Sequence, residues 1–547
     1  MDFKRVLICL AACAAWALPI GAAHADPACE GLKQLKLPDT TITAAESRPA
    51  GVMEFGGVGI PGAAPMPPVK NAMPAYCRVS GSIHPTPDSD IRFEVWMPLR
   101  GWNHRYQQVG NGGLAGSIPE ASMVDPLQHG WAVAGTDDGH VGASMDDARW
   151  ALGHPEKVID YGYRAVHLTA QRAEAIVQAF YRMKAAHRYF VGCSDGGRES
   201  LMEAQRYPAD FDGFLAGSAA RDIPGLQIGG MYISRVAASL GNALLSAAQM
   251  QFVVRKALQQ CDALDGVRDG VIADPPRCHF NPEALICRAS QNGGAAGPGS
   301  ATCLTAAQAT AIREVYEGPR DPKTGRSLAY GFADTVGTAV PGLQAGDPPS
   351  NLERQVFDNM VYGDPNLDPA TLDLAQAERD ARAKLDAIIS PNSADLRHLA
   401  ASGKKLIQYH GWADPLIPAQ SSVDYYKAVQ RTSGDTRDYY RLFMVPGMGH
   451  CGGGVGPTWL ASPAVRHDAD HDAVQALTRW VEKDVAPDQI IATEFGGPVP
   501  NPIVGPPAGA PVKSTRPICA YPRVARYKGH GSTSDASNFE CAAPGAG

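Results

Sequence analysis

The sequence lacks the features that several classes of protein require. Beyond its first residues, no apolar run approaches the roughly 20 residues that span a bilayer, and the formal charge of -7 is spread without long runs of one sign. A basic stripe that would attract nucleic acid or an anionic membrane is therefore missing. Internal repeats, zinc-type Cys and His spacing and a phosphate-cradling loop are also absent. We expect neither a membrane span nor a nucleic-acid partner, and the oligomeric state stays open.

The N-terminus has the pattern of a secretory signal peptide. A short basic region precedes an apolar stretch from Val6 to Gly21, and Ala23 and Ala25 are the small residues that come before a cleavage site. This pattern predicts cleavage after Ala25 and export to the periplasm or the medium. An alternative stays open, because the residues ending at Cys13 also fit the lipid-attachment box of bacterial lipoproteins.

Ten of the 12 cysteines follow the predicted signal peptide, since two lie within it. An even set in an exported protein suggests five disulfides, although spacing alone does not prove their connectivity. The local couples are Cys29 and Cys77, Cys261 and Cys278, Cys287 and Cys303, and Cys519 and Cys541; Cys193 and Cys451 are left over.

The rest of the chain, 44% hydrophobic and 19% charged, has the composition of a soluble globular protein. Helical patterns, notably 163–183, 199–206 and 473–485, alternate with apolar runs typical of strands. Such alternation predicts an α/β fold with a largely parallel sheet. The strand-like runs are 93–97, 106–109, 131–134, 189–192, 214–216, 406–409, 440–445 and 490–493.

The alternation fails between about Ser218 and Leu396, where four cysteines, Gly- and Pro-rich loops and helical pieces replace it. Sheet-type patterning resumes near Lys404, so we interpret the middle as an insertion into one domain, placed where a lid would cover a site. The expected organisation is a signal peptide over 1–25, the two parts of an α/β-hydrolase domain over 26–217 and 397–547, and a lid domain over 218–396.

Gly192-Cys193-Ser194-Asp195-Gly196 joins a strand-like run to a helical one. A serine on a sharp strand-to-helix turn needs small neighbours, because its backbone is strained and its hydroxyl must project clear of the sheet. We therefore predict that Ser194 is a nucleophile. Its partners should follow as an acid and then a histidine, each after a later strand. Asp414 and His450 occupy those places, with Asp414 orienting the histidine and His450 acting as general base.

An oxyanion hole needs two amides. The helix start after the serine supplies that of Asp195, and the glycine-rich loop after the 106–109 run can supply a second, for which we choose Gly113.

The segment from Cys261 to Val271 clusters three carboxylates with two Asp-Gly turns. Hard oxygen ligands at close spacing, with peptide carbonyls turned inward, suit calcium, although the spacing is not that of an EF-hand.

Together these motifs resemble the tannase and feruloyl esterase family, which includes mono(2-hydroxyethyl) terephthalate hydrolases. The resemblance rests on the segment from Gly192 to Glu199, the loop around Asp414, Gly449-His450-Cys451 and the Asp-rich loop. It implies a disulfide between Cys193 and Cys451, the other four cysteine couples as disulfides, and a substrate-lining role for His410. It further implies a structural calcium in the lid, held by Asp262, Asp265 and Asp269 and the carbonyls of Val267 and Val271.

The function implied is a secreted serine esterase that cleaves esters of gallic or hydroxycinnamic acids through an acyl-enzyme. Three alternatives stay open: a terephthalate monoester hydrolase, a peptidase or lipase on the same fold, and a non-catalytic exported binding protein.

Overall fold

A computed structural model describes residues 26–545 except 56–68, 288–301, 347–350, 463, 498, 500–504 and 508. Residues 1–25, with the predicted signal peptide and Cys13, lie outside this range. The chain builds a nine-stranded sheet in the order β1-β4-β5-β7-β6-β8-β9-β10-β11. The bounds are β1 Thr40–Arg48, β4 Tyr76–Ile83, β5 Ile91–Pro98, β6 Arg105–Val109, β7 Ala132–Thr136, β8 His187–Cys193, β9 Gly213–Gly217, β10 Lys405–Gly411 and β11 Tyr440–Val445.

The six strands from β7 to β11 along the sheet are parallel, whereas β1, β4 and β5 are antiparallel additions. The parallel strands are apolar on both faces because helices cover both. Helices α4 (Ala165–Tyr181), α5 (Asp195–Arg206) and α13 (Gln420–Ser433) pack on one face, and α14 (Ala473–Lys483) packs on the other. This is the predicted α/β architecture, and it places the carboxyl ends of β8, β10 and β11 at one edge.

Seven of the eight strand-like runs belong to this sheet, and the eighth corrects the prediction. The run 490–493 lies in β12 (Gln489–Phe495), which pairs with β13 (Val512–Cys519) in a separate two-stranded sheet. Two further hairpins lie apart from the main sheet. They are formed by β2 (Gly51–Phe55) with β3 (Val69–Met73), and by β14 (Val524–Tyr527) with β15 (Phe539–Ala542).

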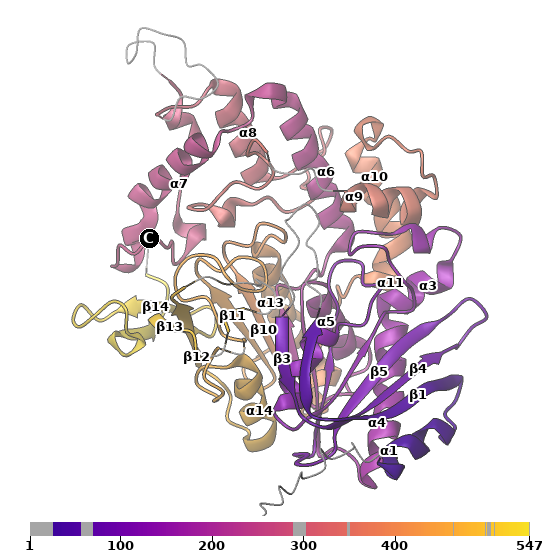
Figure 1. Cartoon of the computed structure of the whole chain (residues 1–547). Helices are drawn as coiled ribbons and strands as arrows, with labels where there is room; N and C mark the ends of the chain where they lie inside the picture. The colour runs from indigo at the N-terminus through magenta and orange to yellow at the C-terminus, as the bar shows by residue number, and fades with distance from the viewer. Residues whose placement is uncertain are drawn as a thin grey trace, which may run out of the picture.

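The chain leaves the sheet after β9 and re-enters it at β10, and the residues between form the helical insertion (Figure 1). In Figure 1 the helices labelled α6 to α10, coloured magenta to orange, lie above the strands. Within the described residues, no helix is long and apolar enough to cross a membrane. The helices are α6 Ile223–Leu240, α7 Ala247–Cys261, α8 Ala306–Glu317, α9 Leu352–Val356, α10 Leu374–Ala381, α11 Ala387–Ile389 and α12 Arg397–Ala401.

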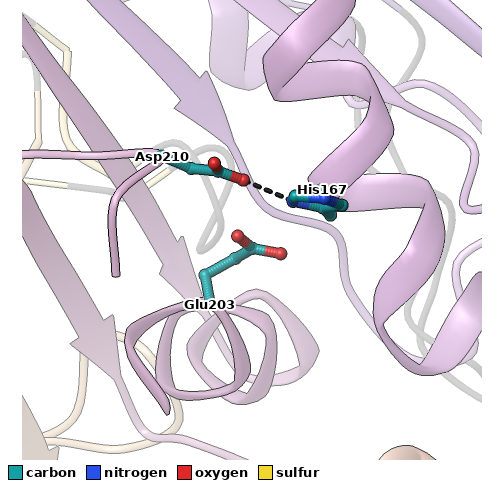
Figure 2. A group of neighbouring side chains, drawn as sticks. All are labelled: His167, Glu203 and Asp210. Carbon is teal, nitrogen blue, oxygen red and sulfur yellow. Dashed lines mark hydrogen bonds and ion pairs between the residues drawn. The ribbon is translucent and has the colours of Figure 1, made fainter. Parts of the chain in front are cut away.

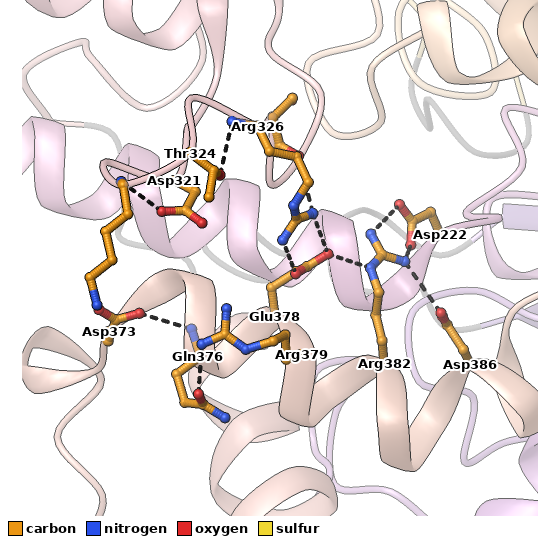
Figure 3. A network of polar contacts seen from close by, with 12 residues as sticks. Asp222, Asp321, Thr324, Arg326, Asp373, Gln376, Glu378, Arg379, Arg382 and Asp386 are labelled. Atoms are coloured by element: carbon orange, nitrogen blue, oxygen red, sulfur yellow. Dashed lines mark hydrogen bonds and ion pairs between the residues drawn. The ribbon is translucent and has the colours of Figure 1, made fainter.

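An ion-pair network within the insertion joins its helices near the start of α6 (Figure 3). Arg382, in the turn that continues α10, donates to Asp222 at 2.8 Å and to Glu378 at 2.6 Å, and Arg326 donates to Glu378 at 2.8 Å. One hydrophobic cluster also joins Phe357 of the insertion to loop residues that follow β6 and β10. The insertion therefore packs against the loops at the carboxyl edge of the sheet.

Five disulfides cross-link the described residues, and they are the five expected couples. Their members are Cys29 and Cys77, Cys193 and Cys451, Cys261 and Cys278, Cys287 and Cys303, and Cys519 and Cys541.

Candidate active site

Ser194 lies on a strained turn between β8 and α5. Its φ of 64° and ψ of -119° are unfavourable for a residue with a side chain. A Cβ on Gly192 would lie only 2.4 Å from the carbonyl oxygen of Gly196, so the turn requires glycine there. Ser194 donates its amide to Gly217 at 3.0 Å, and Gly196 donates to Asn111 at 2.8 Å. The turn is thus held between the end of β9 and the loop that follows β6.

Asp414 and His450 follow β10 and β11, and they form a hydrogen-bonded pair. His450 Nδ1 donates to Asp414 Oδ2 at 2.8 Å. The other carboxylate oxygen accepts the amides of Leu416 at 2.9 Å and Ile417 at 3.0 Å. Burial alone would raise the pKa of Asp414, but the attraction of His450 and hydrogen bonds with His410 and His450 outweigh burial and hold the pKa well below its ordinary value. Asp414 is therefore ionised across the physiological range.

His410, for which the family resemblance implies a substrate contact, is buried beside the acid. Its side chain is 0% exposed, and Nε2 lies 3.3 Å from Asp414 Oδ2. The same nitrogen lies 3.1 Å from the Ile417 carbonyl oxygen, while Nδ1 lies 2.7 Å from Ser422 Oγ. The four-residue spacing does bring His410 to the acid, but on the side that faces the protein interior.

The disulfide between Cys193 and Cys451 connects the two halves of the site. Its Cα atoms are 5.9 Å apart, and each cysteine is the chain neighbour of Ser194 or His450. Cys451 also donates its amide to Ser218 Oγ at 3.4 Å. Two loops that are 258 residues apart in sequence are therefore held together beside the nucleophile.

The two predicted oxyanion donors lie on either side of a buried tyrosine. Asp195 is the first residue of α5, so its amide has no partner within the helix. Gly113 has a φ of +61°, and a Cβ there would lie 2.3 Å from the Met145 carbonyl oxygen. The Tyr161 hydroxyl donates to Asp195 Oδ1 at 2.8 Å and lies 3.4 Å from the Gly113 carbonyl oxygen. Tyr161 thereby fixes the spacing of the loop and the helix start.

A buried acidic cluster beneath the turn was not found from the sequence. Asp138, Asp195 and Glu199 are all buried, and each has a carboxylate oxygen within 4.8 Å of those of the others. Arg198 neutralises Asp195 through hydrogen bonds of 2.5 and 3.1 Å, and Glu199 accepts the Asn111 amide at 3.1 Å. The four-residue spacing of Asp195 and Glu199 hinted at a shared helix face, but Asp138 comes from the loop after β7.

The charges of this cluster do not balance unless a carboxyl group is protonated. Burial, reinforced by Asp195, raises the pKa of Glu199 to about 7, although Asp138, Arg198 and the Asn111 amide act against the rise. Burial and then Glu199 raise the pKa of Asp138 well above its ordinary value. A proton kept on Asp138 or Glu199 gives the cluster less charge than its residues suggest.

The Asp-rich loop offers carboxylate oxygens to a cation, and two of its aspartates, Asp265 and Asp269, also lie near Arg516, at 3.8 and 2.6 Å. Asp265 Oδ2 is buried without a hydrogen-bond partner among the described residues, as suits a cation ligand. Arg516 donates to Asp269 Oδ2 at 2.6 Å, and Asp262 accepts the Gly270 amide at 3.1 Å. In the described part of the chain, these three carboxylates are not among the groups that converge within 4.8 Å.

Comparisons with known proteins agree with this geometry. Residues 77–542 match the sequence model of the family described as tannase and feruloyl esterase. An uncharacterized esterase of Xanthomonas campestris pv. campestris is 37% identical over 95% of this chain and 92% of its own length. A probable feruloyl esterase B-2 of Aspergillus terreus is 32% identical over 85% of this chain and 86% of its own.

A solved structure has the same fold throughout. The crystal structure of feruloyl esterase B from Aspergillus oryzae superposes with a TM-score of 0.79 at 27% identity, covering 94% of this chain and 99% of the other. The resemblance therefore includes the insertion as well as the sheet.

Proposed function

Because the chain belongs to the tannase and feruloyl esterase family of carboxylic ester hydrolases, we propose that it cleaves esters of hydroxycinnamic or gallic acids through an acyl-enzyme on Ser194. The hydrogen-bonded pair of Asp414 and His450, in the order and strand positions that a serine hydrolase requires, is the observation that carries this proposal.

The proposed reaction has two halves. His450 Nε2 takes the proton of Ser194 as its Oγ attacks the ester carbonyl carbon, and the Asp195 and Gly113 amides stabilise the oxyanion. The protonated His450 then gives its proton to the leaving alkoxide as the ester C–O bond breaks. In the second half, His450 deprotonates a water that attacks the acyl carbon, and its return of the proton to Ser194 releases the aromatic acid. Asp414, which is ionised throughout, stabilises the imidazolium in both halves.

A substrate panel with a Ser194→Ala variant tests this proposal. The panel consists of methyl ferulate, methyl gallate, chlorogenate and mono(2-hydroxyethyl) terephthalate. We expect the wild type to prefer one of the first three, and Ser194→Ala to lose activity by at least about 10³-fold while keeping its fold. A variant that retains activity within about tenfold would contradict the role of Ser194.

The same measurements separate the alternatives. Preference for mono(2-hydroxyethyl) terephthalate would favour the terephthalate esterase, and preference for acyl-glycerols or peptides would favour a lipase or peptidase. A covalent serine probe that labels the wild type but not Ser194→Ala would exclude a non-catalytic binding protein.

We also propose a structural Ca²⁺ in the insertion, held by Asp262, Asp265 and Asp269 and the carbonyls of Val267 and Val271. Two observations support it: Asp265 Oδ2 is buried without a hydrogen bond among the described residues, with Arg516 no nearer than 3.8 Å, and the disulfide between Cys261 and Cys278 is a neighbour of the loop. Elemental analysis of protein purified without chelator should find about one calcium per chain, and chelation should lower Tm. If the purified protein contains no calcium, the proposal is wrong, and Arg516 is the group that balances the charge of this loop.

Export to the periplasm or the medium is the proposed location, and the five disulfides support it. N-terminal sequencing of mature protein should begin at Asp26. An acylated N-terminal Cys13 would instead favour the lipoprotein alternative.

A further inference from the structure

A second polar cluster lies at the far end of the helix that begins beside Ser194. It contains His167 of α4, Glu203 of α5 and Asp210 of the loop that follows α5 (Figure 2). His167 Nδ1 lies 2.5 Å from Asp210 Oδ2, and one ligand atom from each of the three residues lies within 4.8 Å of the other two. Figure 2 shows the Glu203 carboxylate directed toward the His167 and Asp210 pair.

The burial of Glu203 without a hydrogen-bond donor from the described part of the chain is not explained by the packing of the helices. Its side chain is 1% exposed, and among the described residues neither carboxylate oxygen has a hydrogen-bond partner. The nearest guanidinium along the helix, that of Arg206, is turned to the Ala387 carbonyl oxygen and the Met202 sulfur. A buried carboxylate without a donor is costly unless it is protonated or binds a cation.

The three side chains offer the donors that a divalent transition metal prefers. An imidazole nitrogen with two carboxylates suits Zn²⁺, whereas Ca²⁺ and Mg²⁺ favour all-oxygen sites. Zinc binds such atoms at about 2.1 Å, so its ligands lie about 3 to 4 Å apart. The present spread of up to 4.8 Å therefore needs only small side-chain movements.

We propose that His167, Glu203 and Asp210 bind a divalent transition-metal ion, with Zn²⁺ the best-suited ion and solvent completing its coordination. His167 and Asp210 are partly exposed, with side-chain exposures of 19% and 15%, and give the ion a path from solvent. Bound metal would join α4 to the end of α5, so its effect is on the stability of the sheet and helix layers.

Zinc uptake by the full mature chain tests this site. Wild type and Glu203→Gln are freed of metal with chelator, dialysed against ZnCl₂ and analysed for bound zinc and Tm. We expect the wild type to retain about one more zinc per chain, and its Tm to rise by about 3 °C at a hundredfold excess over Kd. The Glu203→Gln variant should show neither change, and its metal-free Tm should equal or exceed that of the wild type because glutamine cannot ionise at this buried position.

His471→Ala is the matched control. His471 Nδ1 lies 2.7 Å from Asp468 Oδ1, a similar partly buried pair, but within the described residues this pair belongs to no such three-residue cluster. This variant should keep the zinc response of the wild type. If Glu203→Gln does not fold, Asp210→Asn replaces it. Two results would overturn the proposal: equal zinc uptake by the wild type and the Glu203 or Asp210 variant, or a wild-type Tm that does not change when ZnCl₂ is added. Glu203 would then be a protonated buried acid.

Discussion

Two sets of buried carboxyl groups flank the nucleophile turn, and they differ in what surrounds them. Asp414 faces two histidines and two backbone amides, so its pKa is low in spite of burial. Asp138, Asp195 and Glu199 share a single guanidinium, that of Arg198, and the pKa of Glu199 rises to about 7. Both sets are withdrawn from water, so the number of donors decides the charge.

The difference matches what each set does for the site. A carboxylate that orients His450 must stay ionised while the histidine gains and loses a proton. Glu199 only accepts the Asn111 amide of the glycine-rich loop, a contact that a neutral acid can also make. We therefore expect loss of charge at Asp414 to affect catalysis, and loss of charge in the cluster to affect stability.

Asp414→Asn is the most severe test of this comparison. The amide keeps the shape of the side chain but cannot stabilise the imidazolium, so turnover should fall by about 10⁴-fold in a folded protein. The matched control is Asp138→Asn, since asparagine tolerates the φ of 61° at that position. Its turnover should stay within about tenfold of the wild type. If Asp414→Asn and Asp138→Asn lost turnover equally, the proposed difference between Asp414 and the acidic cluster would be wrong.

Loss of the disulfide between Cys193 and Cys451, which joins the Ser194 turn to the His450 loop, should have the next largest effect on turnover. Replacing Cys193 and Cys451 with alanine frees the turn from the His450 loop, and a shift of about 1 Å can cost on the order of a hundredfold in rate. The released 258-residue loop should also lower the free energy of unfolding by up to about 5 kcal/mol. Turnover is measured at a temperature where circular dichroism shows the variant folded. Full turnover there would limit the bridge to a structural role.

His410→Gln sharpens the comparison from the Asp414 side. Because His410 contacts Asp414 and is fully buried, its loss should weaken the orientation of the acid and lower kcat by about tenfold. KM for methyl ferulate should change by less than about twofold, because the His410 side chain is fully buried. A raised KM with unchanged kcat would instead restore the substrate-binding role predicted from the family resemblance.

The sequence located the features that are local in the chain. The predicted positions of Ser194, Asp414 and His450 rest on an apolar run directly before each, and the structure confirms that these runs are strands β8, β10 and β11 of the parallel sheet. Strands β1 and β4 were missed because polar and apolar residues mix along them. The strand β12 was assigned to the main sheet because a short apolar run does not reveal its partner.

Features that depend on contacts between distant segments could not be predicted in the same way. The family resemblance implies a substrate-lining role for His410, but the sequence does not show that its ring contacts Asp414, Ser422 and Ile417 in the interior. Asp138 and Glu199 are 61 residues apart, and only the packing of α5 against the loop after β7 brings them together. Their raised pKa values follow from that burial.

The smallest expected effect is a dependence of stability on pH, measured as the Tm of Glu199→Gln and wild type at pH 5 and pH 8. The folded pKa of Glu199, about 7, lies above the ordinary value of 4.5. Between these values the native protein holds a proton that the unfolded chain has released, so this stabilisation is complete below about pH 4.5 and is lost as the pH rises through 7. Glutamine keeps the acceptor for Asn111 and never ionises. The variant should match the wild type near pH 5 and exceed it by about 2 to 4 °C at pH 8.

Glu482→Gln is the control, for which the effect on Tm at pH 8 should have the opposite sign. Burial raises the pKa of Glu482, but hydrogen bonds from Arg105, at 2.6 Å, and Tyr189 lower it below the ordinary value. That depressed pKa means its stabilisation is present above the ordinary value and is lost in acid, so removing the charge should lower Tm at pH 8. If both variants shift Tm in the same direction at pH 8, then burial rather than the balance of donors governs these carboxyl groups, and the contrast between the two sets fails.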